Sequence, residues 1–123
     1  VICDEATIYD SVFVKKEAEV IFACEDDIPI GFALFFHNFS TFMGKKGLYL
    51  EDLFVIPEKR GKGYGKALFQ YLGRLANERG CKRYEWVCLN WNEPSINFYK
   101  SFGAVPMDEW TTFRLSGNAL KNI

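Results

Sequence analysis

The fold of this chain is decided by the stretch Arg60-Gly61-Lys62-Gly63-Tyr64-Gly65-Lys66, which separates two segments of different character. Residues 48–56, which precede it, are apolar apart from Glu51 and Asp52 and are typical of a buried strand. Residues 64–79, which follow it, repeat apolar side chains at helical spacing. The sequence therefore predicts a glycine-rich turn between a strand and a helix, where backbone N–H groups can bind phosphate.

The spacing of the glycines restricts the kind of phosphate ligand. A nucleotide P-loop needs Ser or Thr after its lysine, but Ala67 follows Lys66. A dinucleotide fingerprint that started at Gly61 would need a glycine at position 66. The pattern that fits is R-x-x-G-x-G, formed by Arg60, Gly63 and Gly65. The alternative is an ordinary strand–helix turn that is rich in glycine.

The composition indicates one globular domain. The chain has 123 residues, 49% of them hydrophobic and 17% aromatic, which is enough for a single core. No apolar run approaches the roughly 20 residues that cross a bilayer. A formal net charge of -1 favours neither nucleic acid nor a membrane surface as a partner. Because its four cysteines form no C-x-x-C pair and it has one histidine, we expect no metal site and a cytoplasmic location.

Hydrophobic periodicity and turn residues predict the other elements of the chain. The elements expected are a short helix at residues 4–13, strands at 20–24 and 30–36, a loop at 39–47, a strand at 83–89, a helix at 92–102 that Asn92 caps, and a last strand at 110–115. The strands on either side of the helix at 64–79 should be parallel, because a helix connects them.

A second motif begins at Asn90 and reads Asn-Trp-Asn-Glu-Pro-Ser-Ile-Asn-Phe-Tyr-Lys-Ser-Phe-Gly-Ala. Together with R-x-x-G-x-G, it resembles the GCN5-related N-acetyltransferase (GNAT) superfamily, most closely the diamine (spermidine/spermine) and thialysine acetyltransferases. The resemblance covers roughly residues 1–115. It implies an α/β (α+β) fold with a mixed, mostly antiparallel sheet, central parallel strands that splay apart, and flanking helices. The family's first strand and helix are apparently absent, so we expect residues 1–123 to be one N-acetyltransferase domain, incomplete at its N-terminus.

The resemblance implies that acetyl-CoA is the acetyl donor and that it enters between the splayed strands. Pantetheine is expected to pair with the backbone of residues 53–55, and the pyrophosphate is expected on the amides of residues 60–66. Asn92 is expected to contact the donor from the opposite side. The donor-binding residues implied are Leu53, Phe54, Val55, Arg60, Gly61, Lys62, Gly63, Tyr64, Gly65, Lys66, Asn92 and Tyr99.

Acetylation of an amine needs a base, because an alkyl ammonium has a pKa of about 10.4. Glu51 is the first candidate, since it is a carboxylate on an otherwise apolar strand next to the turn. Glu85, between Tyr84 and Trp86, is the second candidate. For both, the alternative is a carboxylate that pairs with a nearby Lys or Arg.

The thiolate leaving group accepts a proton, and Tyr99 matches the family's general acid. The alternative for Tyr99 is a core aromatic that packs with Ile96 and Phe102. Direct transfer from the thioester to the amine needs no nucleophile from the enzyme, so we expect no covalent role for Cys88.

The acceptor is expected to be a small cationic amine. Acidic side chains and one tryptophan predict a site for it, and these residues are Glu51, Asp52, Glu109 and Trp110. The function inferred is acetylation of a small di- or polyamine or a lysine analogue. A peptide or protein N-acetyltransferase of the same fold and a non-catalytic module that senses CoA are the alternatives. The resemblance also implies a homodimer.

Overall fold

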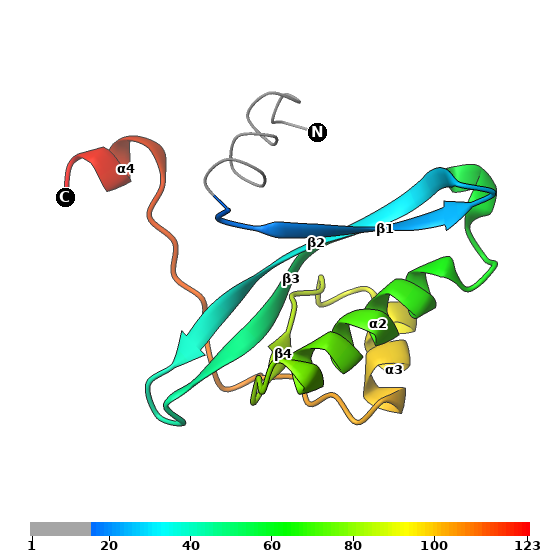
Figure 1. Cartoon of the computed structure of the whole chain (residues 1–123). Helices are drawn as coiled ribbons and strands as arrows, with labels where there is room; N and C mark the ends of the chain where they lie inside the picture. The colour runs from blue at the N-terminus through cyan, green and yellow to red at the C-terminus, as the bar shows by residue number, and fades with distance from the viewer. Residues whose placement is uncertain (1–15) are drawn as a thin grey trace. The chain divides into compact units, whose positions relative to one another are not determined.

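The computed structural model describes residues 16–123, in two compact units of which one ends at Val87 and the other begins at Cys88. Figure 1 labels the helices and strands of both units. The helix predicted at residues 4–13 lies outside the described residues.

The first unit contains a four-stranded sheet in the order β1-β2-β3-β4. Its strands are β1 Glu19–Glu25, β2 Ile28–Ser40, β3 Lys45–Val55 and β4 Tyr84–Glu85. The first three strands are successive antiparallel neighbours, whereas β3 and β4 are parallel. The parallel pair confirms the predicted strand–helix–strand unit, and the sheet is mixed, as the α/β prediction requires.

Two helices connect β3 to β4. The short 3₁₀ helix η2, Pro57–Lys59, begins directly after β3, and α2 follows at Tyr64–Glu78. The helix predicted at residues 64–79 is therefore confirmed. It ends where Gly80 takes a left-handed conformation, φ 74°, which a glycine adopts at low cost.

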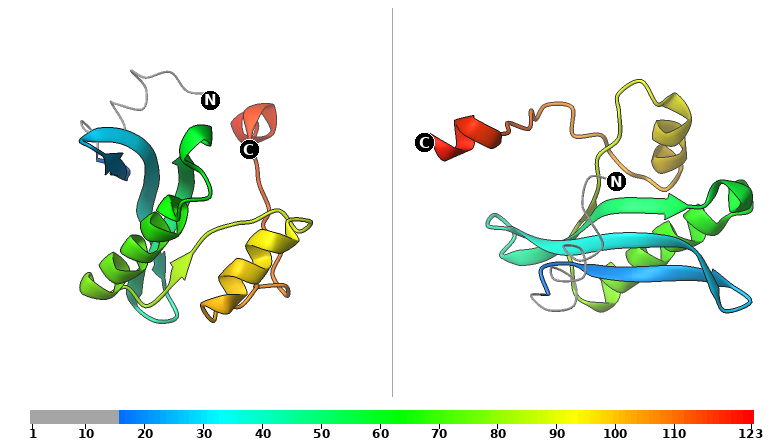
Figure 2. Two further views of the ribbon diagram at one scale, coloured as in Figure 1. Left: turned by 90° about the vertical axis from the view of Figure 1, so that its right-hand side faces the viewer. Right: turned by 90° about the horizontal axis from the view of Figure 1, so that it is seen from above.

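The core of this unit lies between α2 and one face of the sheet (Figures 1 and 2). Leu68 and Leu72 are four residues apart on α2 and are 4% and 0% exposed, because that spacing puts both on the same helical face. Ala33, Phe35 and Leu48 are buried opposite them in the sheet. This packing fixes where α2 begins relative to the end of β3.

The loop predicted at residues 39–47 is wrong for most of its length. Strand β2 continues to Ser40 and β3 begins at Lys45, so only residues 41–44 form the turn. The backbone groups of this stretch are satisfied by pairing between β2 and β3. Its lysines and glycines give no local signal of that pairing. Gly47 serves packing in the strand, because a Cβ there would lie 2.3 Å from Oδ1 of Asn38.

The strand predicted at residues 83–89 is shorter in the structure. Only Tyr84 and Glu85 are strand, and they pair with Leu48 and Tyr49 of β3. A strand requires a partner for its backbone groups, and among the described residues β4 has only these two pairings.

The second unit contains α3, Glu93–Ser101, and α4, Gly117–Lys121. Asn92 caps α3 as predicted, because its Oδ1 accepts a hydrogen bond from the Ser95 N–H at 3.3 Å. The strand predicted at residues 110–115 is wrong, since these residues have no regular structure. Within this unit, the described residues include no other strand with which they could pair.

Candidate functional site

The carboxyl-terminal half of β3 contains a β-bulge at Glu51. Leu34 pairs with Asp52 and Phe35 pairs with Leu50, so Glu51 has no partner of its own on β2. The alternation of burial changes phase there, and Glu51 and Asp52 are consecutive exposed residues between buried Leu50 and half-buried Leu53. Bulges are frequent beside active sites because they redirect side chains. Two adjacent carboxylates in an apolar strand were the sequence signal for this bulge, which periodicity alone did not predict.

The other edge of β3 is only partly paired. Strand β4 contacts it at Leu48 and Tyr49, and the residues from Leu50 to Val55 have no strand partner on that side among the described residues. This edge therefore offers backbone groups to an extended ligand, in the way that sheet edges accept an added strand. The sequence-predicted positions Leu53, Phe54 and Val55 all lie on it.

The glycine-rich turn lies between η2 and the start of α2. Gly61 and Gly63 have left-handed φ angles of 79° and 89°, and an added Cβ at either would meet no atom within 4 Å. Gly63 is the N-cap of α2, and no side chain caps the first N–H groups of that helix. An uncapped helix start with open space above it fits a phosphate group.

Arg60 connects the turn to the end of β3. Its Nε donates a hydrogen bond to the carbonyl oxygen of Val55 at 2.8 Å, and its guanidinium lies 5.3 Å from the centre of the Phe54 ring. The first residues of α2 approach the same strand, because a Cβ at Gly65 would lie 3.7 Å from Leu53 Cδ2. The first unit thus brings together the strand end and the turn that the sequence assigned to one ligand. Lys62 and Lys66 are exposed at the turn.

Glu85 is held by two neighbours. Its Oε1 accepts a hydrogen bond from Asn38 Nδ2 at 3.1 Å and lies 3.0 Å from Nε of Arg83, at an angle that makes this contact an ion pair without a hydrogen bond. This is the pairing with a cation that the sequence left open as the alternative to a catalytic role. Glu51 and Asp52, by contrast, are exposed and have no ion pair with any described residue.

Tyr99 lies on α3 in the second unit. Burial, and then the nearby Cys88, raise the pKa of the Tyr99 phenol above its ordinary value. Its ring lies 5.5 Å from that of Phe98, which in turn packs edge-on against Phe102 at 5.2 Å. A half-buried phenol with a raised pKa stays protonated at neutral pH and can donate a proton.

The remaining predicted residues of the second unit are Asn92, Glu109 and Trp110. Asn92 uses its side chain as the α3 cap. Glu109 and Trp110 are exposed in the segment without regular structure, and Trp110 keeps 76% of its surface accessible. The predicted site residues are thus divided between the two units, with the strand end and the turn in the first.

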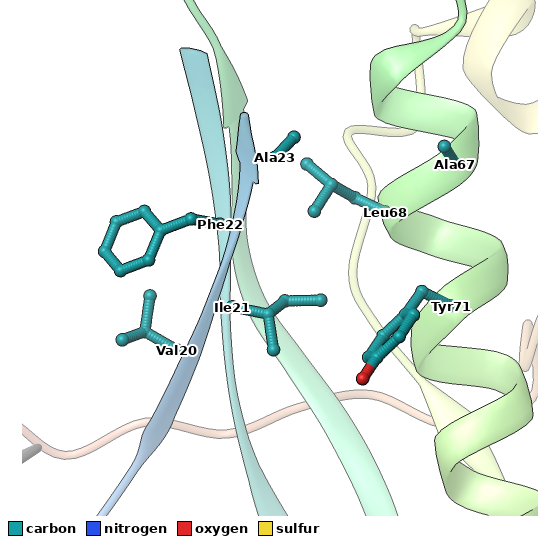
Figure 3. A pocket seen from close by; sticks show the side chains of 7 residues that line it. All are labelled: Val20, Ile21, Phe22, Ala23, Ala67, Leu68 and Tyr71. Carbon is teal, nitrogen blue, oxygen red and sulfur yellow. The ribbon is translucent and has the colours of Figure 1, made fainter. Parts of the chain in front are cut away.

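An apolar pocket opens elsewhere in the first unit, between β1 and α2. Figure 3 shows Ile21 and Ala23 of β1 pointing toward α2, where Leu68 and Tyr71 face them, while Val20 and Phe22 point away. Its lining has no carboxylate, amine or imidazole, so the pocket offers no acid or base at neutral pH. In the described part of the chain no group of His, Cys, Asp and Glu could hold a metal ion, and no helix is long and apolar enough to cross a membrane.

The sequence matches the acetyltransferase (GNAT) family over residues 2–104. The chain belongs to this family. It is 42% identical over 98 residues to L-ornithine N5-acetyltransferase NATA1 of Arabidopsis thaliana, a match that covers 80% of this chain and 43% of that protein. It is 32% identical over 102 residues to the thialysine N-epsilon-acetyltransferase of Mus musculus, over 80% of this chain and 59% of the relative.

A solved structure has the same fold as this GNAT chain. The V. cholerae integron cassette protein VCH_CASS6 superposes with a TM-score of 0.82 at 32% identity, over 98% of this chain and 77% of that one. The chain spans about half the length of the curated relatives described above.

Proposed function

We propose that this protein is an acetyl-CoA-dependent N-acetyltransferase that transfers acetyl directly to a primary amine of a small di- or polyamine or a lysine analogue. The observation that carries the proposal is the junction of β3 and α2. A bulged strand with one unpaired edge leads within a few residues into an uncapped helix start. Membership of the GNAT family supports acetyl transfer as the chemistry of this junction.

The two parts of the junction suit the two parts of coenzyme A. The amide-containing pantetheine arm can pair with the open edge at Leu53–Val55, and the diphosphate can lie against the N–H groups of residues 60–66. Lys62 and Lys66 supply positive charge beside that diphosphate. Asn92, at the start of α3, contacts the donor through polar atoms that are not used in its cap hydrogen bond with Ser95.

Glu51 is the proposed base. Bound amine arrives as an ammonium ion with a pKa of about 10.4, and it can attack the thioester only after losing a proton. The bulge presents Glu51 to solvent beside the open edge, where its carboxylate can accept that proton directly or through a water molecule. Glu85 stays the second candidate, although Arg83 and Asn38 already occupy its Oε1 atom.

Tyr99 is the proposed general acid. Departure of the thiolate from the thioester leaves a sulfur that takes up one proton, and a protonated phenol can supply it. The raised pKa makes the Tyr99 phenol a weaker acid, so the role rests on the match of Tyr99 to the family motif and not on the pKa shift.

Acidic side chains suit a cationic acceptor. Asp52 adjoins Glu51 on the exposed side of β3, and Glu109 and Trp110 are the residues proposed from the second unit. The relatives named for L-ornithine N5 and thialysine N-epsilon acetylation support the terminal amine of a short side chain as the acceptor group.

The test is a panel of acceptors with acetyl-CoA, followed by release of free thiol. The panel contains spermidine, diaminopropane, thialysine, ornithine and lysine-containing peptides. We expect turnover with one or more of the small amines. Activity on peptides alone would establish the protein acetyltransferase alternative, and binding of CoA without turnover of any amine would establish the sensor.

The proposed assembly is a homodimer. Phe39, Phe42 and Met43, at and beside the β2–β3 turn, are 61%, 98% and 50% exposed, and an apolar cluster of this kind suits an interface. Light scattering at several concentrations measures the mass directly. A monomeric mass throughout would contradict the dimer.

A further inference from the structure

Glu25, at the end of β1, contacts both ends of the glycine-rich turn. Its Oε1 accepts a hydrogen bond from Lys59 Nζ at 2.5 Å, and its Oε2 accepts one from the Tyr64 hydroxyl at 2.5 Å. Lys59 is the last residue of η2, and Tyr64 is the first residue of α2. A single carboxylate therefore bridges the two residues that flank residues 60–63.

The backbone fixes the position of this carboxylate. Glu25 pairs with Ile28, and the two residues between them, Asp26 and Asp27, have left-handed φ angles of 52° and 64°. Positive φ at both central residues is the geometry of the tight two-residue hairpin turn, which suits the twist of the flanking strands. Glu25 is thus held by a short hairpin, while the turn that it contacts is longer and rich in glycine.

The charge of Glu25 opposes a simple role in attracting an anion. Hydrogen bonds from Lys59 first, and then from Tyr64, lower the pKa of the Glu25 carboxyl, so it is ionised at neutral pH. The charge of Lys62 acts in the same direction. A carboxylate beside a phosphate site repels the phosphate and neutralises a lysine that could attract it. A favourable effect of Glu25 on phosphate binding therefore requires that Glu25 arrange the turn.

We propose that Glu25 is a positioning residue for the donor, which holds Lys59 and Tyr64 so that the turn and the first N–H groups of α2 face one diphosphate. The inference rests on the proposed function, because it takes coenzyme A as the ligand of the turn. Arg60 holds the same turn from the strand side through the Val55 carbonyl, so the two contacts together restrict it from both directions.

Loss of the Glu25 charge and loss of its hydrogen bonds should change the affinity for coenzyme A in opposite directions in Glu25→Ala. Loss of a negative charge alone tightens the binding of an anionic ligand, whereas loss of the bridge weakens it. We expect the Kd for coenzyme A and the KM for acetyl-CoA to rise about threefold or more, the scale of losing modest hydrogen bonds. We expect kcat to change less than twofold, because Glu25 touches no reacting atom in the proposed mechanism.

A donor without the diphosphate separates positioning from general damage to the fold. With S-acetylpantetheine, Glu25→Ala should keep the kcat/KM of the unmodified protein, since this donor does not use the turn. Glu58→Ala is the matched control, because Glu58 is an exposed carboxylate next to Lys59 and outside the hydrogen-bonded cluster. It removes the same charge and should leave the Kd for coenzyme A unchanged or lower.

Two conservative variants keep the inference testable if Glu25→Ala folds poorly. Glu25→Gln retains hydrogen-bonding atoms and should raise the Kd for coenzyme A less than alanine does. Tyr64→Phe removes one arm of the bridge and should have little further effect once Glu25 is alanine. Unchanged or tighter binding of coenzyme A by Glu25→Ala, or an equal loss with S-acetylpantetheine, would overturn the inference. If the unmodified protein binds no coenzyme A, the proposed function itself fails.

Discussion

Glu51 and Glu85 lie on neighbouring strands of one sheet, yet their surroundings differ. Glu51 occupies a bulge at which β3 has no partner on the β4 side among residues 16–123, and its side chain is exposed. Glu85 lies where β3 and β4 are still paired, opposite Tyr49, and Arg83 and Asn38 contact it. The exposed carboxylate without an ion pair to a described residue thus lies beyond the last β3–β4 pair, and the carboxylate that contacts Arg83 and Asn38 lies within it.

The difference has a physical cause in the backbone. A strand paired on both sides puts its side chains on two faces in strict alternation, whereas a bulge adds a residue that the alternation cannot bury. The bulge lies in the pairing of β3 with β2, whereas the edge on which Leu53 and Val55 lie opens on the other side of β3, where the pairing with β4 ends at Tyr49. The base and the donor site of the proposed function thus depend on two neighbouring irregularities of β3, one on each side of the strand.

Replacement of the two carboxylates by their amides gives the largest expected effect. Glu51→Gln should lower kcat/KM for the best amine about 100-fold, the lower end for loss of general base catalysis. Glu85→Gln is the matched control and should lower it far less. Steady-state kinetics at a single pH checks both. A larger loss in Glu85→Gln would assign the base to β4.

Removal of the Tyr99 hydroxyl tests the acid that complements Glu51. Tyr99→Phe should lower kcat about tenfold, less than the base variant, because a thiolate whose thiol has a pKa of about 8.5 can leave without help. The Kd for coenzyme A, measured by calorimetry, should stay within a factor of two. Asn97→Ala alters the same helix at an exposed position and serves as the control. Unchanged kcat in Tyr99→Phe would leave Tyr99 as the packed aromatic that the sequence also allowed.

Local chemistry made part of this fold predictable. The glycine-rich turn, the helix from Tyr64 and the Asn92 cap depend on residues close together in sequence, and all three were predicted correctly. The stretch at residues 39–47 was predicted as a loop because its lysines and glycines are weak strand formers. It is mostly strand because a long-range partner pairs with it, and no local pattern reports that partner.

The strands predicted at 83–89 and 110–115 are mostly not formed, because here a local strand pattern lacks a pairing partner. Both have apolar and aromatic residues in a strand-like pattern, but pairing covers only Tyr84 and Glu85 of the first and none of the second. For the site, two adjacent carboxylates in an apolar strand made Glu51 a candidate base, and that role stays a prediction. The contact of Arg60 with the Val55 carbonyl and the bridge made by Glu25 needed the structure, because their partners lie on other elements.

The turn that follows the bulge can be tested through its backbone. Gly63→Ala places a Cβ at φ 89°, and we expect it to lower the free energy of unfolding by about 1 kcal/mol. Gly44→Ala is the matched control, because Gly44 also has a left-handed φ, 62°, with open space around it, but lies in the β2–β3 turn. Urea unfolding should give similar losses for both variants. Only Gly63→Ala should also weaken coenzyme A binding, and equal binding in the two would contradict a role for the turn.

A third carboxylate extends the comparison to stability, with the smallest expected effect. Glu19 of β1 pairs with Arg79 at the end of α2, with N–O distances of 2.6 and 2.9 Å, and hydrogen bonding to Arg79 is the main cause that lowers the pKa of the Glu19 carboxyl. Because its folded pKa is below the ordinary value of about 4.3, Glu19 stabilises the fold above that pH. The contribution is lost as the pH falls through the folded pKa.

Protonation of nearby His37 also destabilises the fold as the pH falls, and it begins at a higher pH than that of Glu19. Burial, and then Arg79, lower the pKa of its imidazole, so protonation of His37 favours unfolding as the pH falls below about 6.5.

Glu19→Gln should lower the free energy of unfolding by less than about 1 kcal/mol at pH 7, since 45% of the Glu19 side chain is exposed. The difference should shrink as the pH falls through the lowered folded pKa of Glu19, because below it the carboxyl is protonated in both states. Glu17→Gln, at an exposed position, should show no such dependence in urea unfolding. A pH-independent difference for Glu19→Gln would mean that Glu19 stabilises the end of α2 by packing, because only its charge titrates in this range.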